Sequence, residues 1–179
     1  MAQIPGGLTL LRSQEISDTS IVGTKDISLP QPVADLARTI YYPQWINGGG
    51  FLGSSPYLGH LLSFELTARD NLRVTNAGDP AGLYPFVLKI EEYAENLRAR
   101  VASGAVSFGP TNPTTNLAIT PVRRVDRAGV LRLSDYQKSY DRPNWGRFRL
   151  SAVNNLEVIT YQYNDSTSPT LKFLVFERP

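Results

Sequence analysis

The chain has 179 residues, of which 41% are hydrophobic, with 14 glycines, 13 prolines, no cysteine and a net charge of +2. The missing cysteines exclude a disulfide framework, thiol chemistry and cysteine-ligated metal sites, and the many glycines and prolines favour short elements joined by turns. We expect neither a membrane span nor a secretory signal, because no apolar run approaches the ~18 residues of a span and the N-terminus lacks a basic and apolar leader.

The first part of the chain reads as short strands. The expected elements are a strand at 8–11, a polar loop or weak edge strand at 16–22, a strand at 27–29 and a further strand at 35–42. The third must end early, because Pro30 and Pro32 cannot donate a ladder hydrogen bond. The fourth is also compatible with one helical turn, but its similarity to 130–133 favours a strand.

An aromatic, glycine-rich connection at 41–57 precedes the next strand, and the second half carries a similar connection at 136–145. Loops on a rigid β scaffold are frequent recognition sites, and Tyr and Trp often anchor interfaces. The two tryptophans could instead plug the open ends of the sandwiches. The candidate interface or ligand-contact residues are Tyr41, Tyr42, Trp45, Tyr57, Tyr136, Tyr140, Arg142 and Trp145.

The strongest feature is a stretch that occurs twice, as Phe64–Val74 and, in degenerate form, as Phe148–Val158. Phe, Leu, Ala, Asn-Leu and Val keep the same spacing in both copies, and Thr67 is replaced only by Ser151. Apolar and polar residues alternate on either side of a polar Asp-Asn or Asn-Asn pair. This pattern predicts a strand, a tight turn and a second strand, with one face in a core.

The repeat extends beyond this motif. The expected matches are 86–91 with 173–177, each an apolar run closing on an acid, then 4–7 with 101–104, and 27–29 followed by Val33 with 117–119 followed by Val125. Two copies of one unit imply two domains, a first module at 1–93 and a second module at 94–179. Short strands with frequent turns predict an all-β fold of two tandem β-sandwich or jelly-roll-like modules that pack together. Only 90–101 is a candidate for a short helix.

The two halves differ in charge. Residues 1–93 hold six Lys and Arg against nine Asp and Glu, whereas residues 94–179 hold twelve against seven. The basic module could dock on an acidic partner or on the acidic module of a neighbouring subunit, or the charges could be solvated strand faces. The arginines are too dispersed in the sequence to predict direct nucleic-acid binding. The arginines that carry the excess are Arg98, Arg100, Arg123, Arg124, Arg127, Arg132, Arg142, Arg147 and Arg149.

No pattern of catalytic residues emerges. His60 is the only histidine and has no nucleophile elbow to serve. The Gly-x-Gly-x-x-Gly pattern at 48–53 is followed by Ser-Ser-Pro and not by the helix that a dinucleotide-binding site needs. The aspartates show no EF-hand spacing, which leaves at most a weak calcium site in a loop. We therefore expect no enzyme activity, no cofactor and no metal site.

The second half carries Ser103–Phe108, Leu117–Thr120 with Val125-Asp126, Gly146–Ser151, Asn155–Val158 and Lys172–Glu177, in that order. This order resembles the β repeat of virion proteins of tailed bacteriophages. The resemblance covers most of 101–177 and, more faintly, 4–92, where the first copy departs by its enlarged aromatic connection. It implies a place in a phage particle, and because the family pattern marks core strands, it assigns no catalytic residue.

The sequence thus predicts a noncatalytic structural component of a phage virion, either a capsid decoration or cement protein or a tail-associated protein. It would assemble in the host cytoplasm, form a homo-oligomer and bind the major capsid or tail proteins of the same particle. The main alternative is a receptor-binding module for a host surface glycan, with Tyr42, Trp45, Tyr140 and Trp145 stacking on sugars. A capsid jelly roll in its own right is a third possibility, but it lacks the basic N-terminal arm that genome packaging often uses.

Overall fold

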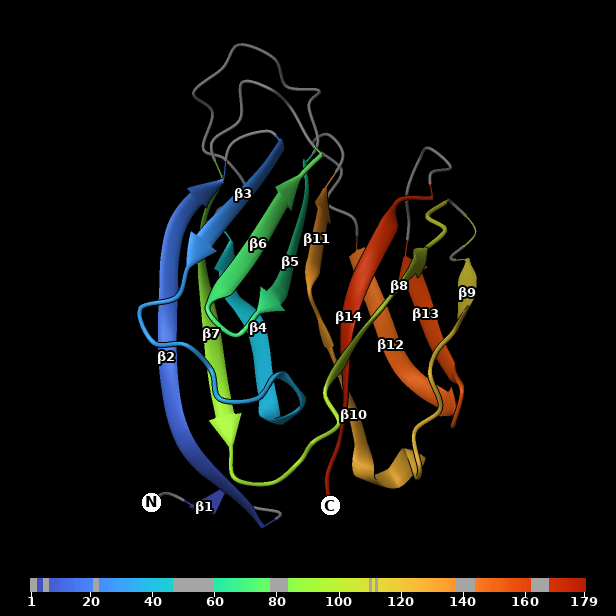
Figure 1. Ribbon diagram of the computed structural model, residues 1–179. Coiled ribbons are helices and arrows are strands. Elements are labelled where there is room, and N and C mark those ends of the chain that lie inside the picture. Colours follow the sequence, from blue (N-terminus) through green and yellow to red (C-terminus); the bar gives the residue numbers. More distant parts are fainter. Residues whose placement is uncertain are drawn as a thin grey trace.

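The computed structural model describes residues 3–4, 7–20, 23–46, 60–77, 84–109, 111, 113–137, 144–161 and 168–179. The described elements are β-strands and two single turns of 3-10 helix, so the predicted all-β fold is confirmed (Figure 1). The short helix expected at 90–101 is wrong, because strand β7 continues to Tyr93 and a non-helical connection then leads to β8.

The first module contributes seven strands and the turn η1 (Leu36–Arg38). They form the sheets β1-β2-β7-β4 and β5-β6-β3, and the second of these is extended by β11 from the other module. The strands are β1 (Gln3–Ile4), β2 (Leu8–Ser20), β3 (Gly23–Ser28), β4 (Thr39–Ile46), β5 (His60–Ala68), β6 (Asn71–Asn76) and β7 (Tyr84–Tyr93).

The second module also contributes seven strands, together with the turn η2 (Val125–Arg127). Its own sheets are β10-β14-β8 and β12-β13-β9. The strands are β8 (Arg100–Ala105), β9 (Thr114–Ala118), β10 (Ala128–Arg132), β11 (Ser134–Gln137), β12 (Asn144–Ala152), β13 (Asn155–Tyr161) and β14 (Thr170–Glu177).

Both modules have the same nested topology. β2 and β8 pair with β7 and β14, the last strands of their modules, and β3 and β9 pair with β6 and β13. Each last strand pairs on its other side with β4 or β10, and every pairing is antiparallel. In each module the other strands of these pairs are nested around a central hairpin, β5-β6 or β12-β13, and those that precede this hairpin alternate between the two sheets, as in a small jelly roll. The predicted tandem β-sandwich or jelly-roll-like organisation therefore describes the fold.

The duplicated motif is the strand-turn-strand that was predicted, and it forms β5-β6 and β12-β13. Its asparagine has the same task in both copies. The Nδ2 of Asn71 donates to the Oγ1 of Thr67 at 2.7 Å, and the Nδ2 of Asn155 donates to the Oγ of Ser151 at 2.6 Å. The bond needs a side-chain hydroxyl four residues before the asparagine, and both Thr and Ser supply one. This explains why Thr67 is replaced by Ser151.

The structure corrects three details of the predicted repeat. Val33 matches Val122 and not Val125, because the N–H groups of Val33 and Val122 donate to the carbonyls of the two motif turns, each at 2.7 Å. The acid that matches Glu177 is Glu92 and not Glu91, since Thr39 pairs with Glu92 as Ala128 pairs with Glu177.

Residues 16–20, expected in a loop or a weak edge strand, continue the 13-residue strand β2. Within the described ranges they pair on one side only, with β7, so the edge-strand alternative describes them. The third corrected match is that of 4–7 to 101–104. Residues 101–104 lie in β8, which pairs with the last strand of its module, and the strand in that position in the first module is β2. The region comparable to 101–104 therefore lies within β2.

Each sandwich is filled by side chains from both of its sheets. Phe64 of β5 meets Phe86 of β7 with ring centroids 5.0 Å apart, and Phe148 of β12 meets Phe173 of β14 at 5.7 Å. Phe64, Phe86 and Phe173 are fully buried. Pairs of this kind contribute about 1 kcal/mol beyond the area that they bury.

The two modules are joined by a shared strand. β10 pairs with β14 of its own module, but β11, which follows after Leu133, pairs with β5 of the first module (Figure 1). The N–H of Leu133 donates to Lys172 and its carbonyl accepts from Phe64, both at 2.9 Å. The ammonium of Lys172 also forms an ion pair with Glu65. The expected packing of the modules is therefore present and includes hydrogen bonds between sheets.

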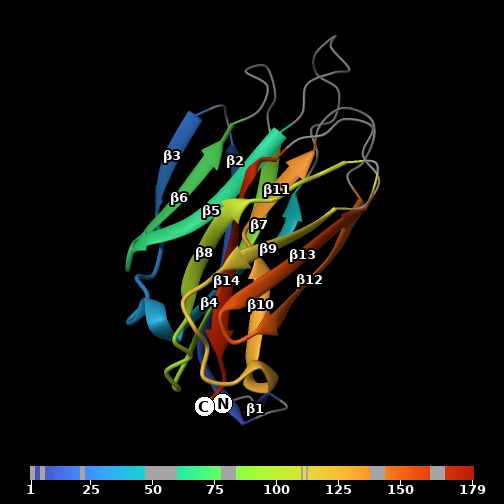
Figure 2. The same cartoon turned by 90° about the vertical axis from the view of Figure 1, so that its right-hand side faces the viewer.

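The C-terminal residues lie beside the turn η2, where the N–H of Arg178 donates to the carbonyl of Arg127 at 2.8 Å. Both termini appear at the same end of the molecule in two perpendicular views (Figures 1 and 2). The connection between the modules also runs at this end, where the N–H of Ala99 donates to Ala37 near η1 and the carbonyl of Leu97 accepts from Glu177. We call this end of the molecule, which includes η2 and the connection from Ala94 to Ala99, the terminal end. It carries the candidate site.

Candidate functional site

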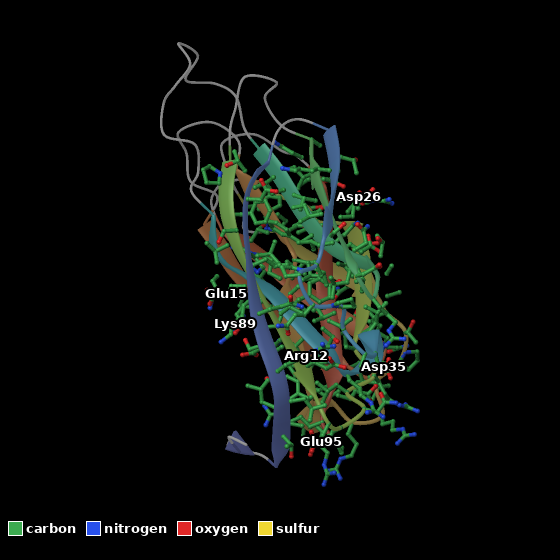
Figure 3. The ribbon with its side chains drawn as sticks, turned by 60° about the vertical axis from the view of Figure 1, so that its left-hand side comes forward. Arg12, Glu15, Asp26, Asp35, Lys89 and Glu95 are labelled. Carbon is green, nitrogen blue, oxygen red and sulfur yellow. The ribbon has the colours of Figure 1, made fainter. Side chains whose placement is uncertain are left out.

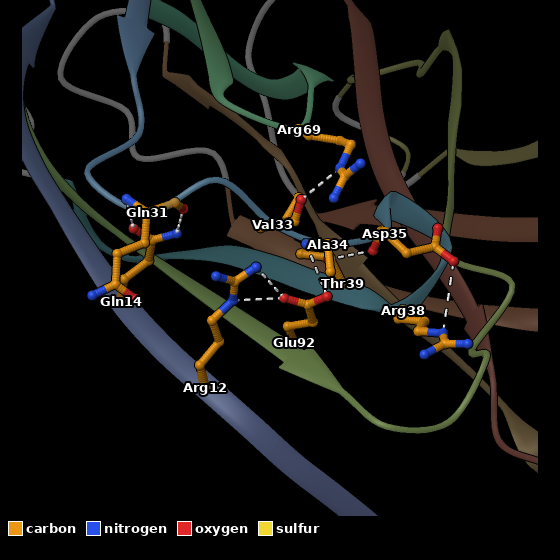
Figure 4. A network of polar contacts seen from close by, with 10 residues as sticks. All are labelled: Arg12, Gln14, Gln31, Val33, Ala34, Asp35, Arg38, Thr39, Arg69 and Glu92. Carbon is orange, nitrogen blue, oxygen red and sulfur yellow. Dashed lines mark hydrogen bonds and ion pairs between the residues drawn. The ribbon is translucent and has the colours of Figure 1, made fainter.

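Each module has a buried glutamate near the terminal end of the molecule. In the first module, Glu92 is 2% exposed and accepts the N–H of Ala34 at 3.0 Å and the Nε of Arg12 at 2.6 Å (Figure 4). Hydrogen bonds to an ionised group are stronger than neutral ones, and they offset the cost of burying the carboxylate. The glutamate thereby ties β2, β7 and the segment before η1 together.

The second module repeats this arrangement with Glu177, which is 5% exposed. It accepts the N–H of Arg123 at 2.8 Å and the Nη1 of Arg100 at 3.0 Å. Burial disfavours the charged form, but the bond from Arg123 and the guanidinium of Arg100 outweigh burial and lower the pKa of Glu177. Arg100 also donates to the carbonyls of Thr120 and Pro121, each at 3.0 Å, which fixes the approach to η2.

Acidification is expected to destabilise the fold through this carboxylate. Because the folded pKa of Glu177 lies below the unfolded value of about 4.3, its ionised form contributes stability above that pH, and the contribution is lost as the pH falls through the folded pKa. Urea midpoints measured from about pH 6 to about pH 3 should fall in the native chain and fall less steeply in Glu177→Gln. An identical pH dependence in both proteins would contradict this role.

The two copies differ where the buried glutamate meets the turn. Ala34 and Asp35 precede η1, and Arg123 and Arg124 stand in their places before η2. Asp35 caps its turn by accepting the N–H of Ala37 at 2.9 Å. Arg124 makes no side-chain cap. The second module has therefore exchanged a stabilising cap for positive charge, which is typical of a position used for function.

These arginines line a pocket at the terminal end, with a volume of about 450 Å³. Its walls come from the connection between the modules, the η2 turn and the end of β14. We call it the arginine pocket, and its lining residues are Asn96, Arg98, Arg123, Arg124, Arg127, Glu177, Arg178 and Pro179.

Much of the positive charge in the arginine pocket is uncompensated. Arg124 forms an ion pair with Asp126 at 2.6 Å, and Arg127 donates to the main-chain oxygen of Pro179 at 2.9 Å. The guanidinium groups of Arg98, Arg123 and Arg178 have no hydrogen-bonded acceptor or ion-pair partner within the described ranges. Several like charges in one concave site raise the local potential and attract an anion.

The backbone conformation of Arg98 adds a second signal. Its φ is 48°, and it is the only described residue other than glycine with a positive φ. This conformation costs about 1 to 2 kcal/mol for a residue with a Cβ atom. The N–H of Arg98 bonds to the Oδ1 of Asn96 at 2.9 Å, which holds the tight turn that brings Arg98 to the pocket. Strain of this kind is concentrated at functional sites.

Comparison with known proteins finds no matching family model, no matching curated protein and no matching solved structure. The site must therefore be interpreted from its own geometry. In the described part of the chain, no His, Cys, Asp or Glu side chains gather in a group that could hold a metal ion. Among the same residues, no helix is long and apolar enough to cross a membrane.

Those of the predicted contact residues that the structure describes do not line the arginine pocket. Tyr41, Tyr42 and Trp45 lie in strand β4 and not in a loop, and Tyr136 and Trp145 lie in β11 and β12. The remaining predicted residues, Tyr57, Tyr140 and Arg142, lie outside the described residues. The glycan-binding alternative relies on Tyr42, Trp45, Tyr140 and Trp145. Of these, Tyr140 lies outside the described residues, and the side chains of the two tryptophans are not described.

Tyr41 and Tyr42 have opposite environments. Tyr41 is 4% exposed and packs in the core, where burial raises the pKa of its hydroxyl, so it is not available as a contact residue in this chain. Tyr42 is half-buried and pairs across the sheet with Lys89, which forms an ion pair with Glu91 at 3.0 Å. Glu15 lies near Lys89 on the same side of the sheet (Figure 3). Burial raises the pKa of Tyr42, and the nearby Glu91 adds to this effect.

The sequence contained a signal for the arginine pocket, but not its location. Arg98, Arg123, Arg124 and Arg127 belong to the charge excess of the second half. Their separation along the chain suggested dispersed charge, whereas the fold brings them together at the terminal end. Aligning the copies on Glu92 and Glu177 would have revealed the exchange before the second turn.

Proposed function

We propose that the chain is a noncatalytic structural component of a phage virion, either a capsid decoration or cement protein or a tail-associated protein. The observation that carries the proposal is the difference between the two copies. They share a scaffold and a buried glutamate, but only the second turn carries arginines at both positions before it. A scaffold duplicated in this way, with one copy modified, suits attachment to another protein.

The strand pairing that joins the modules supports the same function. β11 extends a sheet of the first module, so the arginine pocket is held in a fixed relation to the surface of that module. A chain with two coupled surfaces can bind a major capsid or tail protein and a neighbouring copy of itself at once. Such contacts sum strongly on a symmetric particle when the geometry lets both engage.

The experiment is quantitative mass spectrometry of purified particles of the phage whose genome encodes the chain. We expect the chain to copurify with the particles in a fixed ratio to the major capsid or tail protein. A nonstructural protein of similar size from the same lysate serves as the control for contamination. Absence from the particles, or a ratio no higher than that of the control, would refute the proposal.

A further inference from the structure

The arginine pocket offers charged side chains and few backbone donors. The N–H of Arg98 is bonded to Asn96 and that of Arg123 to Glu177. The N–H groups of Arg127, Glu177 and Arg178 donate to carbonyl oxygens of the chain. Sites for isolated phosphate groups commonly use a nest of free backbone N–H groups. Here recognition must come from guanidinium groups, which bind carboxylates and phosphates in bidentate geometry.

The size and composition of the pocket narrow the ligand further. A volume of about 450 Å³ suits a short segment or a small molecule, not a duplex nucleic acid. None of the described lining residues is aromatic, so this described part of the lining has no platform on which nucleic-acid bases could stack. Three guanidinium groups that form no hydrogen bond or ion pair within the described ranges favour a ligand with several negative groups.

We infer that the arginine pocket binds an acidic peptide segment, in which closely spaced Asp or Glu carboxylates pair with Arg98, Arg123 and Arg178. The inference rests on the proposed function, because the segment would belong to the virion protein on which the chain docks. The buried Glu177 does not repel such a segment strongly, because Arg100 and the N–H of Arg123 already neutralise its carboxylate. The pocket thus serves as a receptor for an acidic strand or tail.

The test measures binding of a fluorescent pentaglutamate peptide to the purified full chain by anisotropy. We expect saturable binding that weakens as salt is added, because exposed charges are screened. Arg123→Ala introduces the residue that the first module carries in this position, so the bond to Glu177 should persist. The Arg123→Ala variant should bind the peptide about tenfold or more weakly, as expected for the loss of a charged hydrogen bond.

Two further variants separate binding from folding. Arg98→Gly removes a guanidinium and the strain of the left-handed backbone, so it should weaken binding while leaving the thermal midpoint unchanged or higher. Arg73→Ala removes the same charge from the first module, where Arg73 pairs with Asp26 at 3.0 Å, and should leave binding unchanged. A loss of binding in Arg73→Ala as large as that in Arg123→Ala would overturn the inference.

Two other results would also overturn it. One is the absence of peptide binding at low salt, and the other is tighter binding of a single-stranded pentanucleotide than of the peptide, which would indicate a nucleic-acid site. This assay needs no particle. Peptide binding by a chain that is absent from particles would refute only the proposed function, and copurification without peptide binding would refute only the inference.

Discussion

Leu133→Ala should lower the free energy of unfolding by about 3 kcal/mol, within the range for buried leucines. Leu133 is fully buried and belongs to the core cluster of the first module, although it lies between two strands of the second. Its N–H and carbonyl bond to strands of different modules. The substitution should therefore open a cavity at the joint and make the modules unfold in separate steps, observed as non-coincident urea transitions by circular dichroism and fluorescence.

Leu156→Ala is the matched control for this prediction. Leu156 is also fully buried, but it packs within the core cluster of the second module. The control should cost a similar free energy without changing the coupling between the modules. If Leu133→Ala cost less than about 1 kcal/mol, or if it left the transitions as coincident as the control does, the shared strand would not be what couples the modules.

Glu177→Gln should cost about 2 kcal/mol at neutral pH, within the range for hydrogen bonds to charged groups. The carboxylate is 5% exposed and is bonded to Arg123 and Arg100. A glutamine oxygen can still accept one of these bonds, but its amide group would face a guanidinium. Because the backbone of Arg123 is held by this carboxylate, peptide binding should also weaken. Urea denaturation at neutral pH measures the change in stability.

Glu157→Gln provides the comparison for this effect. Glu157 pairs with Arg149 at 2.8 Å, but the Arg149 side chain is 57% exposed. Exposed ion pairs contribute about 0 to 1 kcal/mol, so this substitution should be nearly neutral. A double-mutant cycle of Glu177→Gln with Arg100→Gln would then isolate the coupling within the buried arrangement. Equal losses for Glu157→Gln and Glu177→Gln would contradict the proposed importance of the buried carboxylate.

The sequence predicted the fold well where the signal was local. The alternation in 64–74 and 148–158 was sufficient to identify both hairpins and hence the duplication. The sequence misled for Tyr41, because the start of β4 is buried on both faces: the consecutive residues Thr39, Ile40 and Tyr41 are all buried. No local pattern marked Leu133 as the residue at which one strand passes from one module to the other.

The candidate site was harder to predict because it depends on three distant segments. The connection at 96–98, the turn at 123–127 and the chain end at 177–179 meet only in the folded molecule. What the sequence did provide was the charge difference between the copies and the principle that function lies where they diverge. The aromatic connections also differ between the two copies. The described structure, however, gives the arginine pocket a geometry that can be tested.

The proposed docking of the chain on a virion protein is tested most directly by adding the purified chain to particles of the proposed phage that were prepared without it. Its occupancy is then measured by mass spectrometry. The native chain and Arg73→Ala should bind in the same ratio to the capsid or tail protein. Arg123→Ala combined with Arg98→Gly should bind at least tenfold less tightly while remaining folded, because two charged contacts are lost. Equal occupancy of the native chain and this double variant would contradict a docking role for the arginine pocket.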